Sequence, residues 1–277
     1  AVEMAILPTA ALDDAGWANR LADLVPDLQA RNIDRSRWRT AQEFEAREWQ
    51  LRDIVQAERH EFIERYAPVI DRLRVKGLLD RRDSLLEVGS GPTCPSTALE
   101  IPQTYVLDPL MDRFFDVRDK AVTASITAIG EDIPFDDGTF SIVFSRNSID
   151  HGLSPRRAIQ ECVRVLEQGG VFILGQWVYA PAVAVAKQLA ERSGLWRNAG
   201  HPHAFSVRHF QALVEDHATV VDSGVLHVAS GSSDFGKLDS SHDSPPPFAH
   251  RMLSTMNRAL LRSKWFAAEA FWIAVKD

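Results

Sequence analysis

An apolar run that passes directly into a glycine turn constrains the fold of this chain more than any other feature. Residues 85–93 read Leu-Leu-Glu-Val-Gly-Ser-Gly-Pro-Thr, which is typical of a buried strand followed by a sharp turn. Asp108 follows about twenty residues later, at the end of a second apolar run. Alone, a Gly-x-Gly also fits an ordinary strand–helix turn. Paired with the acid, it is typical of the first two strands of a doubly wound sheet that binds a nucleoside.

Short apolar runs bounded by turn residues recur through the rest of the chain. We predict strands at 85–88, 104–107, 121–128, 141–145, 171–177, 219–227 and 268–275. Helical stripes at 154–166, 182–192 and 206–216 alternate with them, and Gly169 and Gly170 are expected to cap the first. This alternation predicts an α/β fold with a doubly wound, mostly parallel seven-stranded sheet.

The N-terminal part has a different texture. From Thr40 to about Tyr66 apolar residues recur near helical spacing among many Glu and Arg, and Pro68 is expected to break or restart the helix. The predicted units are an N-terminal helical segment at 1–75 and a core at 76–277, with insertions at about 178–205 and 229–265.

Composition narrows the class of partner and the compartment. The net charge of -7 argues against binding to a nucleic-acid backbone, which calls for basic surface. Cys94 and Cys162 are the two cysteines, far apart and outside any Cys-x-x-Cys, which suits a reducing compartment. We find neither a bilayer-length apolar run nor a signal-peptide pattern, so we expect a cytoplasmic protein without a membrane partner.

Each residue around the glycine turn suits a part of an adenosyl cofactor. Gly89 and Gly91 let the backbone turn sharply and approach a ligand closely. Asp108 can accept hydrogen bonds from both ribose hydroxyls, and Glu87 can face a cationic amino-acid tail. Because no phosphate-binding lysine accompanies the turn, the pattern favours S-adenosylmethionine. A nicotinamide cofactor is the rival, but the third glycine of its fingerprint falls on Cys94.

Two later segments carry a family resemblance. Residues 130–147 read Gly-Glu-Asp-Ile-Pro-Phe-Asp-Asp-Gly-Thr-Phe-Ser-Ile-Val-Phe-Ser-Arg-Asn and lead to Asp150-His151, and residues 164–170 read Arg-Val-Leu-Glu-Gln-Gly-Gly. With the glycine turn, this succession resembles the class I S-adenosylmethionine-dependent methyltransferases, particularly those that act on small molecules. The resemblance covers roughly residues 84–177. It implies the Rossmann-like methyltransferase fold with an N-terminal helical lid.

The resemblance also implies a set of cofactor contacts. The first motif would hold the methionine part of the cofactor, with the ribose and adenine contacts following along the chain. The residues implied are Glu87, Gly89, Ser90 and Gly91 for the methionine part; Asp108 for the ribose; Pro109, Leu110, Glu131, Asp132 and Ile133 beside the adenine; and Ser145, Arg146 and Asn147 at the end of the fourth strand. The family often has an acid where Ile129 stands, so the adenine amino contact is expected from Glu131, Asp132 or the backbone.

His151 is the candidate catalytic base. It follows the fourth predicted strand by a few residues, and an imidazole pKa of about 6.5 suits proton removal near neutral pH. A structural role at the start of a helix is the alternative. His201 and His203 are candidate substrate contacts, as are Trp49 and Tyr66 on the predicted lid. Two histidines with Asp150 would suit a metal, but no third ligand stands at a characteristic spacing, so we predict no metal site.

The sequence thus predicts a methyltransferase that acts on a small-molecule acceptor and releases S-adenosyl-L-homocysteine. O-methylation of a sugar or natural-product intermediate is the favoured reaction, and N- or C-methylation and a non-catalytic cofactor-binding protein are the alternatives. Methylation of nucleic acid is disfavoured because Ser-Arg-Asn-Ser at 145–148 replaces an Asn-Pro-Pro-Tyr-like motif. The insertions are expected to form either a substrate pocket or a homodimer contact.

Overall fold

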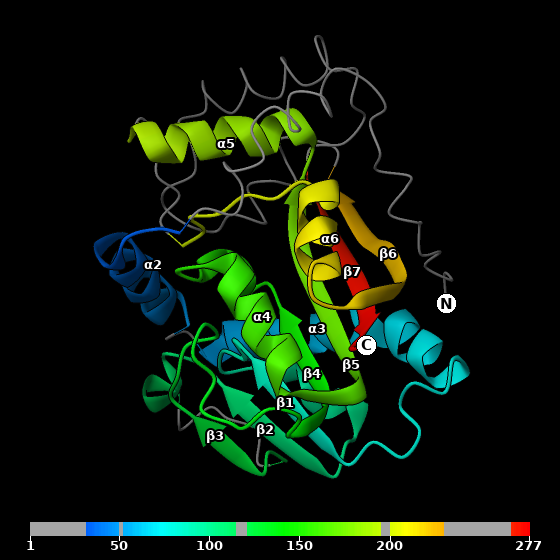
Figure 1. Ribbon diagram of the computed structural model, residues 1–277. Coiled ribbons are helices and arrows are strands. Elements are labelled where there is room, and N and C mark those ends of the chain that lie inside the picture. The colour runs from blue at the N-terminus through cyan, green and yellow to red at the C-terminus, as the bar shows by residue number, and fades with distance from the viewer. Residues whose placement is uncertain (1–31, 50–51, 115–120, 195–199, 230–266) are drawn as a thin grey trace.

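The structure is a computed structural model that describes residues 32–49, 52–114, 121–194, 200–229 and 267–277 (Figure 1). The side chains of residues 52–59 are not described. The predicted helical segment before residue 32 and nearly all of the insertion at about 229–265 lie outside the described residues.

A single seven-stranded sheet organises the described chain, with the strand order β3-β2-β1-β4-β5-β7-β6. Strands β1 to β5 run parallel to one another, and β7 is antiparallel to both β5 and β6. The predicted doubly wound, mostly parallel sheet is therefore confirmed. The strands are β1 (Ser84–Val88), β2 (Gln103–Leu107), β3 (Ala124–Ile126), β4 (Phe140–Arg146), β5 (Leu166–Tyr179), β6 (Thr219–Ala229) and β7 (Ala267–Val275).

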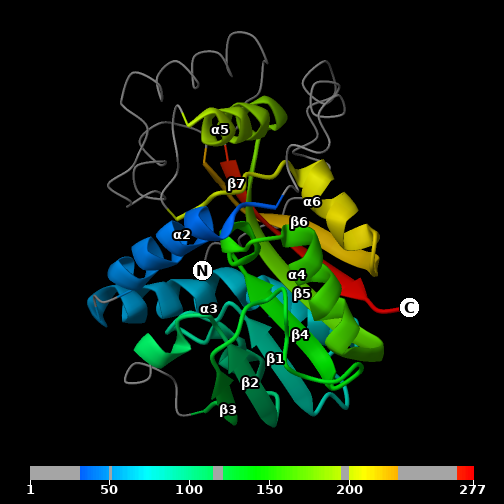
Figure 2. The ribbon, with the colours of Figure 1, turned by 60° about the vertical axis from the view of Figure 1, so that its left-hand side comes forward.

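Helices α4 (Pro155–Val165) and α6 (Val207–Glu215) cover one face of the sheet (Figures 1 and 2). The apolar stripe of α4, which includes Ile159 and Cys162, packs in one cluster with Leu86 and Phe172 of the strands. Alternate residues of a strand point to opposite faces, so the neighbouring residues of β1 face the other side. The helix α5 (Pro181–Ser193) lies beyond the end of β5.

Helix α3 (Arg52–Val75) covers the opposite face (Figure 2). Its Phe62, Tyr66 and Leu73 pack against strand residues such as Leu85 and Phe144. The predicted break at Pro68 is wrong, because α3 continues through it. A proline inside a helix costs about 3 kcal/mol, whereas burying each large apolar side chain contributes about 1.5–3 kcal/mol. The packing of α3 between Phe62 and Leu73 therefore outweighs the local cost.

Helix α2 (Arg35–Glu48) begins at an Asp34 cap, whose side chain accepts a hydrogen bond from the amide of Arg37. Ser154 caps α4 in the same way. Ser206 stands at the cap position of α6, but its hydroxyl contacts the ring of His209 instead of a helix amide. These side-chain caps fix where α2 and α4 start and so orient the loops in front of both helices.

The predicted glycine cap at Gly169 and Gly170 is also wrong. Helix α4 ends at Val165 and β5 begins at the next residue, so both glycines lie within the strand segment. Between the pairs Phe140–Leu166 and Ile142–Val171 the register of β4 and β5 shifts, and the extra residues of β5 bulge out. Gly169 takes a positive φ of 70° in this bulge, which is why a glycine stands there.

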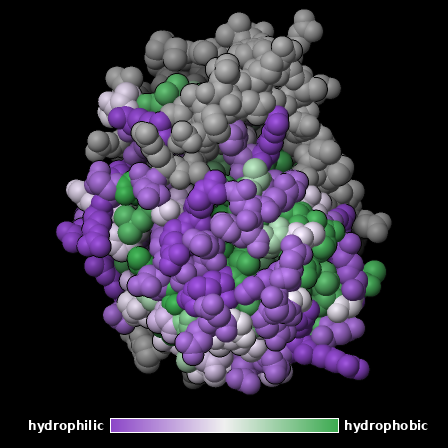
Figure 3. All heavy atoms as spheres, in the orientation of Figure 1, coloured by the Kyte–Doolittle hydropathy of each residue, from purple (hydrophilic) through white to green (hydrophobic). Residues whose placement is uncertain are grey.

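The surface seen in Figure 3 is mostly hydrophilic where it is described, with hydrophobic side chains in small groups between. Among large apolar residues, Ile63, Val75, Leu189 and Val221 are exposed. Within the described residues, every helix is too short or too polar to cross a bilayer.

Candidate functional site

A cavity of about 340 Å³ opens at the carboxyl ends of β1, β2 and β4. This is the edge at which doubly wound sheets bind their ligands, because the order of strands reverses there. Its volume lies in the range of pockets that hold small molecules. The predicted cofactor residues from β1 and β2 line it, together with side chains from α2, α3 and the segment after β4.

The glycine turn forms the floor of the cavity. Gly89 and Gly91 have positive φ values of 71° and 53°, which side chains disfavour. Gly89 is needed for space as well, because a Cβ there would lie 2.1 Å from the Cβ of Ser148. At Gly91 a Cβ would lie 3.8 Å from the ring of Trp49. The turn thus brings bare backbone to the cavity, as a bound nucleoside requires. Ser90 also lines the cavity.

Asp108 ties the end of β2 to the glycine turn. Its Oδ2 accepts a hydrogen bond from the amide of Gly91 (3.0 Å), and its Oδ1 accepts one from the amide of Leu110 (2.8 Å). Burial raises the pKa of Asp108 to about 6, although these two hydrogen bonds oppose the rise. Each carboxylate oxygen has a second lone pair, so the group can still accept hydrogen bonds from ribose hydroxyls.

Glu87 is buried beneath the same turn. It accepts hydrogen bonds from the amide (3.1 Å) and the hydroxyl of Ser96, and it lines the cavity. Burial raises the pKa of Glu87 to about 8, which the hydrogen bonds from Ser96 only partly offset. A cationic group of a ligand beside it would favour the ionised form. The residues around the turn therefore fit an adenosyl group with a charged tail.

The residues predicted beside the adenine divide into two groups. Pro109, Leu110 and Glu131 line the cavity. Oε1 of Glu131 also accepts a hydrogen bond from the amide of Ser154 (2.9 Å) at the start of α4. The structure places Asp132 and Ile133 outside the cavity wall, with Ile133 buried in the main core.

Of the three residues predicted at the end of β4, two line the cavity and one does not. Arg146 and Asn147 line the cavity, whereas Ser145 is fully buried and its hydroxyl contacts that of Ser148 at 2.7 Å. Asn147 has a positive φ of 47°, and its Oδ1 accepts a hydrogen bond from the amide of Trp177 (2.9 Å). The chain thus turns sharply at the point where β4 meets the cavity.

Behind Arg146 lies a buried charge network that sequence reasoning missed. Glu269 of β7 is fully buried and accepts a hydrogen bond from Nε of Arg146 (2.8 Å) and another from Arg65. Burial alone would raise the pKa of Glu269, but the two guanidinium groups hold it below its usual value. The signal was present in the sequence, since Glu269 interrupts an otherwise apolar predicted strand.

Tyr66 belongs to this network and not to the cavity wall. Its hydroxyl donates to Oε1 of Glu269 (3.3 Å), and its ring stacks on that of Phe62. Gly175 makes room for it, because a Cβ there would lie 1.7 Å from the Tyr66 hydroxyl. Burial raises the pKa of Tyr66 well above its usual value. The predicted substrate contact at Tyr66 therefore has no support in its position.

Trp49, at the end of α2, does line the cavity. Its indole N–H donates to Oε2 of Glu45 (3.1 Å), which holds the ring across the glycine turn. Helix α2 thus borders the cavity while α3 packs on the sheet. The division of the chain into a lid at 1–75 and a core stays a prediction.

His151 and His201 face the cavity together, with ring centroids 4.3 Å apart. Nδ1 of His201 contacts Oδ2 of Asp150 at 2.7 Å, and Nε2 of His151 lies 3.8 Å from Oδ1 of the same carboxylate. Burial would raise the pKa of Asp150, but the two imidazoles hold it well below its usual value. Oε1 of Glu45 lies 3.4 Å from Nδ1 of His151. The spacing of residues in the sequence did not predict this contact.

His203 lies away from the cavity. Its side chain is buried, and Nε2 contacts the carbonyl oxygen of Gly152 at 2.9 Å. Burial lowers the pKa of His203 to about 4, so the ring is neutral at pH 7. Its position supports a structural role in joining two loops.

Comparison with known proteins agrees with this architecture. Residues 86–174 match the family described as methyltransferase domain. A sarcosine/dimethylglycine N-methyltransferase of Halorhodospira halochloris is 44% identical over 48 residues, 17% of each chain. A 27-O-demethylrifamycin SV methyltransferase of Amycolatopsis mediterranei is 29% identical over 133 residues, 43% of this chain and 48% of the relative. The chain thus spans less than half the length of the curated relatives it matches.

The fold is similar to that of a solved structure. The crystal structure of the YcgJ protein from Bacillus subtilis superposes with a TM-score of 0.54 at 17% identity, over 78% of this chain and 98% of that one. The resemblance predicted from residues 84–177 is therefore confirmed by the matched family, the sheet order and the superposition. Residues 86–174 thus match the methyltransferase domain family, and the fold of the described chain is similar to that of the YcgJ protein.

Proposed function

We propose that this chain binds S-adenosyl-L-methionine and transfers its methyl group to a small-molecule acceptor, with S-adenosyl-L-homocysteine as the second product. The observation that carries the proposal is the cavity at the strand ends, lined at once by Gly89, Gly91, Glu87 and Asp108. A nicotinamide cofactor fits less well. The dinucleotide fingerprint needs a third glycine for close packing of the helix on the strand, and a buried Cys94 stands at that position.

The acceptor side of the cavity favours a group that loses a proton. Methyl transfer is an in-line displacement, so the protein must align the acceptor, exclude water and, for a hydroxyl, remove a proton. His151 is the proposed base. Asp150 lies beside its Nε2 and would stabilise the imidazolium that forms. This arrangement supports O-methylation over reaction at a neutral amine, which needs no base. A sugar or natural-product hydroxyl remains the proposed acceptor.

Two further features of the proposal rest on composition and charge. The chain has two cysteines, Cys94 and Cys162, which stand outside any Cys-x-x-Cys, and this low cysteine usage supports the cytoplasm as the proposed location. The acidic net charge of -7 supports a small acceptor over a nucleic acid.

Calorimetry tests the cofactor directly. S-adenosylmethionine, S-adenosylhomocysteine and NAD are titrated into the full chain and into the Asp108→Ala variant. We expect micromolar binding of both adenosyl ligands, lost in the variant, and no heat from NAD. A preference for NAD, or adenosyl binding that survives in the variant, would contradict the proposal.

A further inference from the structure

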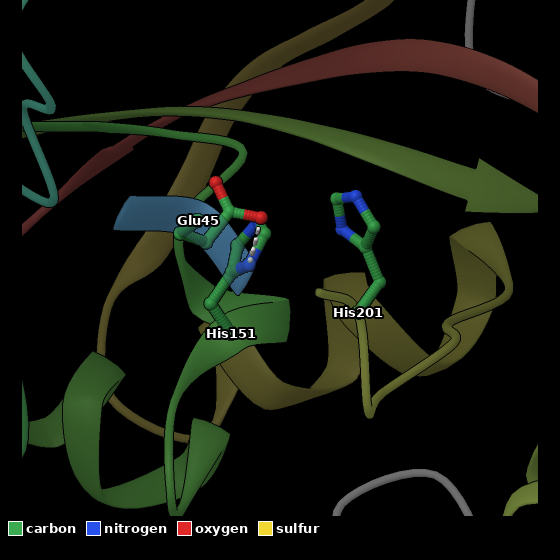
Figure 4. Close-up of side chains that lie close together, drawn as sticks. All are labelled: Glu45, His151 and His201. Carbon is green, nitrogen blue, oxygen red and sulfur yellow. Dashed lines mark ion pairs between the residues drawn. The ribbon is translucent and has the colours of Figure 1, made fainter. Parts of the chain in front are cut away.

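Two imidazoles and one carboxylate converge at the cavity from three separate segments (Figure 4). Glu45 comes from α2, His151 from the 3-10 turn at Ile149–His151, and His201 from the loop before α6. One nitrogen or oxygen of each side chain lies within 4.8 Å of those of the other two. All three side chains line the cavity, so a ligand in the cavity can reach them.

The spacing suits a shared ion. Around a tetrahedral ion with ligands at about 2.1 Å, two donor atoms lie about 3.4 Å apart. Nδ1 of His151 and Oε1 of Glu45 are already 3.4 Å apart. The widest of the three separations, up to 4.8 Å, must shorten by up to about 1.4 Å, which side-chain rotation can supply.

Asp150 is placed as the carboxylate that supports both rings. Metal-binding histidines commonly give their second nitrogen to a carboxylate, which fixes the tautomer and the ring orientation. Here Oδ2 of Asp150 contacts Nδ1 of His201 at 2.7 Å, and Oδ1 lies 3.8 Å from Nε2 of His151. The nitrogens with which the rings would bind an ion are therefore Nε2 of His201 and Nδ1 of His151.

Two atoms of the cluster lack hydrogen bonds among the described residues. They are Nδ1 of His151 and Oδ1 of Asp150, both shielded from solvent. A buried polar atom without a hydrogen bond costs about 1–3 kcal/mol. An ion bound to Nδ1 of His151 would satisfy that atom and draw the ring's other N–H toward Oδ1.

We infer that Glu45, His151 and His201 bind one divalent transition-metal ion, of the Zn²⁺, Co²⁺ or Mn²⁺ type, with Asp150 as a positioning residue. Two nitrogen ligands favour such ions over Mg²⁺ and Ca²⁺, which prefer oxygen throughout. The remaining coordination positions open into the cavity, where water or an acceptor oxygen can occupy them. From the sequence we predicted no metal site, because the spacing of candidate ligands was the sole criterion. Glu45 stands far from both histidines along the chain, so spacing could not identify it.

This inference rests on the proposed function only in calling the open positions an acceptor site. A nitrogen that binds an ion cannot accept a proton at the same time. With the ion bound, His151 is a ligand, and the base role assigned to it above applies to the metal-free chain.

The test uses the full chain after treatment with a chelator. Co²⁺, Zn²⁺ and Mg²⁺ are titrated by calorimetry, and Co²⁺ is also followed by its visible absorption. We expect one Co²⁺ or Zn²⁺ per chain and Mg²⁺ binding at least about 100-fold weaker. His201→Ala and Glu45→Gln should each weaken Co²⁺ binding by about tenfold or more, and Asp150→Asn by about 10–100-fold.

Matched controls exclude binding to surface groups. His60→Ala removes an exposed histidine of α3, and Glu43→Gln removes an exposed acid of α2, so both should bind Co²⁺ like the unaltered chain. Binding below one ion per chain, or binding unchanged in His201→Ala, would overturn the inference. Titration of S-adenosylhomocysteine into the same samples separates the two proposals. If the unaltered chain binds Co²⁺ but not S-adenosylhomocysteine, only the proposed function is contradicted. If it binds S-adenosylhomocysteine but not Co²⁺, only the metal site is contradicted.

Discussion

The amide of Gly91 donates a hydrogen bond to Oδ2 of Asp108 over 3.0 Å, and this contact joins the turn after β1 to the end of β2. Oδ1 of the same carboxylate holds the amide of Leu110. Both oxygens therefore shape the cavity even before a ribose arrives. A change at Asp108 should disturb the glycine turn as well as the ligand contact.

Asp108→Asn tests this double role. The side-chain amide of Asn can accept at one position only, so one of the two backbone hydrogen bonds is lost. Hydrogen bonds to charged groups contribute about 1.5–3 kcal/mol, so S-adenosylhomocysteine affinity should fall about 10–100-fold by calorimetry. Asp112→Asn is the control, because Asp112 is exposed and outside the cavity wall. Equal affinities of the two variants would contradict the role given to Asp108.

Glu87 should release a proton when the cofactor binds. With its pKa raised to about 8 it is mainly protonated at pH 7, and a cationic ligand tail favours its ionised form. At pH 7 up to about 0.9 proton per ligand should leave, measured by calorimetry in buffers of different ionisation enthalpy. The raised pKa also makes the free energy of unfolding depend on pH. The contribution of Glu87 is fully present below about pH 4.5, its ordinary pKa, and is lost as the pH rises through 8. Glu87→Gln should abolish both the proton release and this pH dependence. If the variant still releases a proton on binding, the proton comes from a group other than Glu87.

Gly89→Ala should destabilise the protein more than Gly169→Ala. The two glycines share a positive φ near 70°, which costs a side chain about 1–2 kcal/mol. Gly169 has nothing within 4 Å of an added Cβ, whereas at Gly89 it would lie 2.1 Å from the Cβ of Ser148. Urea unfolding should give the larger loss for Gly89→Ala, and Ser148→Gly should recover part of it. If the effects of Gly89→Ala and Ser148→Gly on the free energy of unfolding are simply additive in a double-mutant cycle, the steric explanation is refuted.

His151→Ala should slow methyl transfer without loss of the cofactor. If the imidazole removes the acceptor proton, or holds an ion that acidifies it, turnover should fall about 10²–10⁴-fold. S-adenosylhomocysteine affinity should change little, because the carboxylates proposed to face the cofactor are Glu87 of β1 and Asp108 directly after β2. Rates are measured with an acceptor identified by screening, and His60→Ala serves as the control. Near-normal turnover would leave His151 with a structural role.

Glu269→Ala should cost far more stability than removal of an exposed ion pair. Its carboxylate is fully buried between Arg65 and Arg146, so truncation removes the buried anion that both guanidinium groups share and costs about 3–5 kcal/mol. The exposed Glu167–Arg82 pair provides the control, because Glu167→Ala should cost about 0–1 kcal/mol. Since its pKa is lowered, the contribution of Glu269 is present above the ordinary carboxyl pKa and is lost as the pH falls. Similar urea midpoints for both variants would contradict this account.

Local sequence patterns were sufficient for the sheet. Most strands contain a short apolar run between turn residues, so their approximate positions follow from the residues themselves. Pro68 and the pair Gly169–Gly170 misled the prediction because local propensity was outweighed by packing of α3 and by a bulge in β5. The link between Glu45 and His151 joins segments far apart in the chain, and no periodicity encodes such a contact.

The position of β7 constrains the order in which the sheet can be completed. It is the last described strand in the chain, yet it lies between β5 and β6. During synthesis the five parallel strands can assemble as soon as they leave the ribosome. Strand β6 must wait for β7 before it has a neighbour in the sheet. A nascent chain can thus form early the half of the sheet that borders the cavity, while Glu269, the buried partner of Arg65 and Arg146, arrives last.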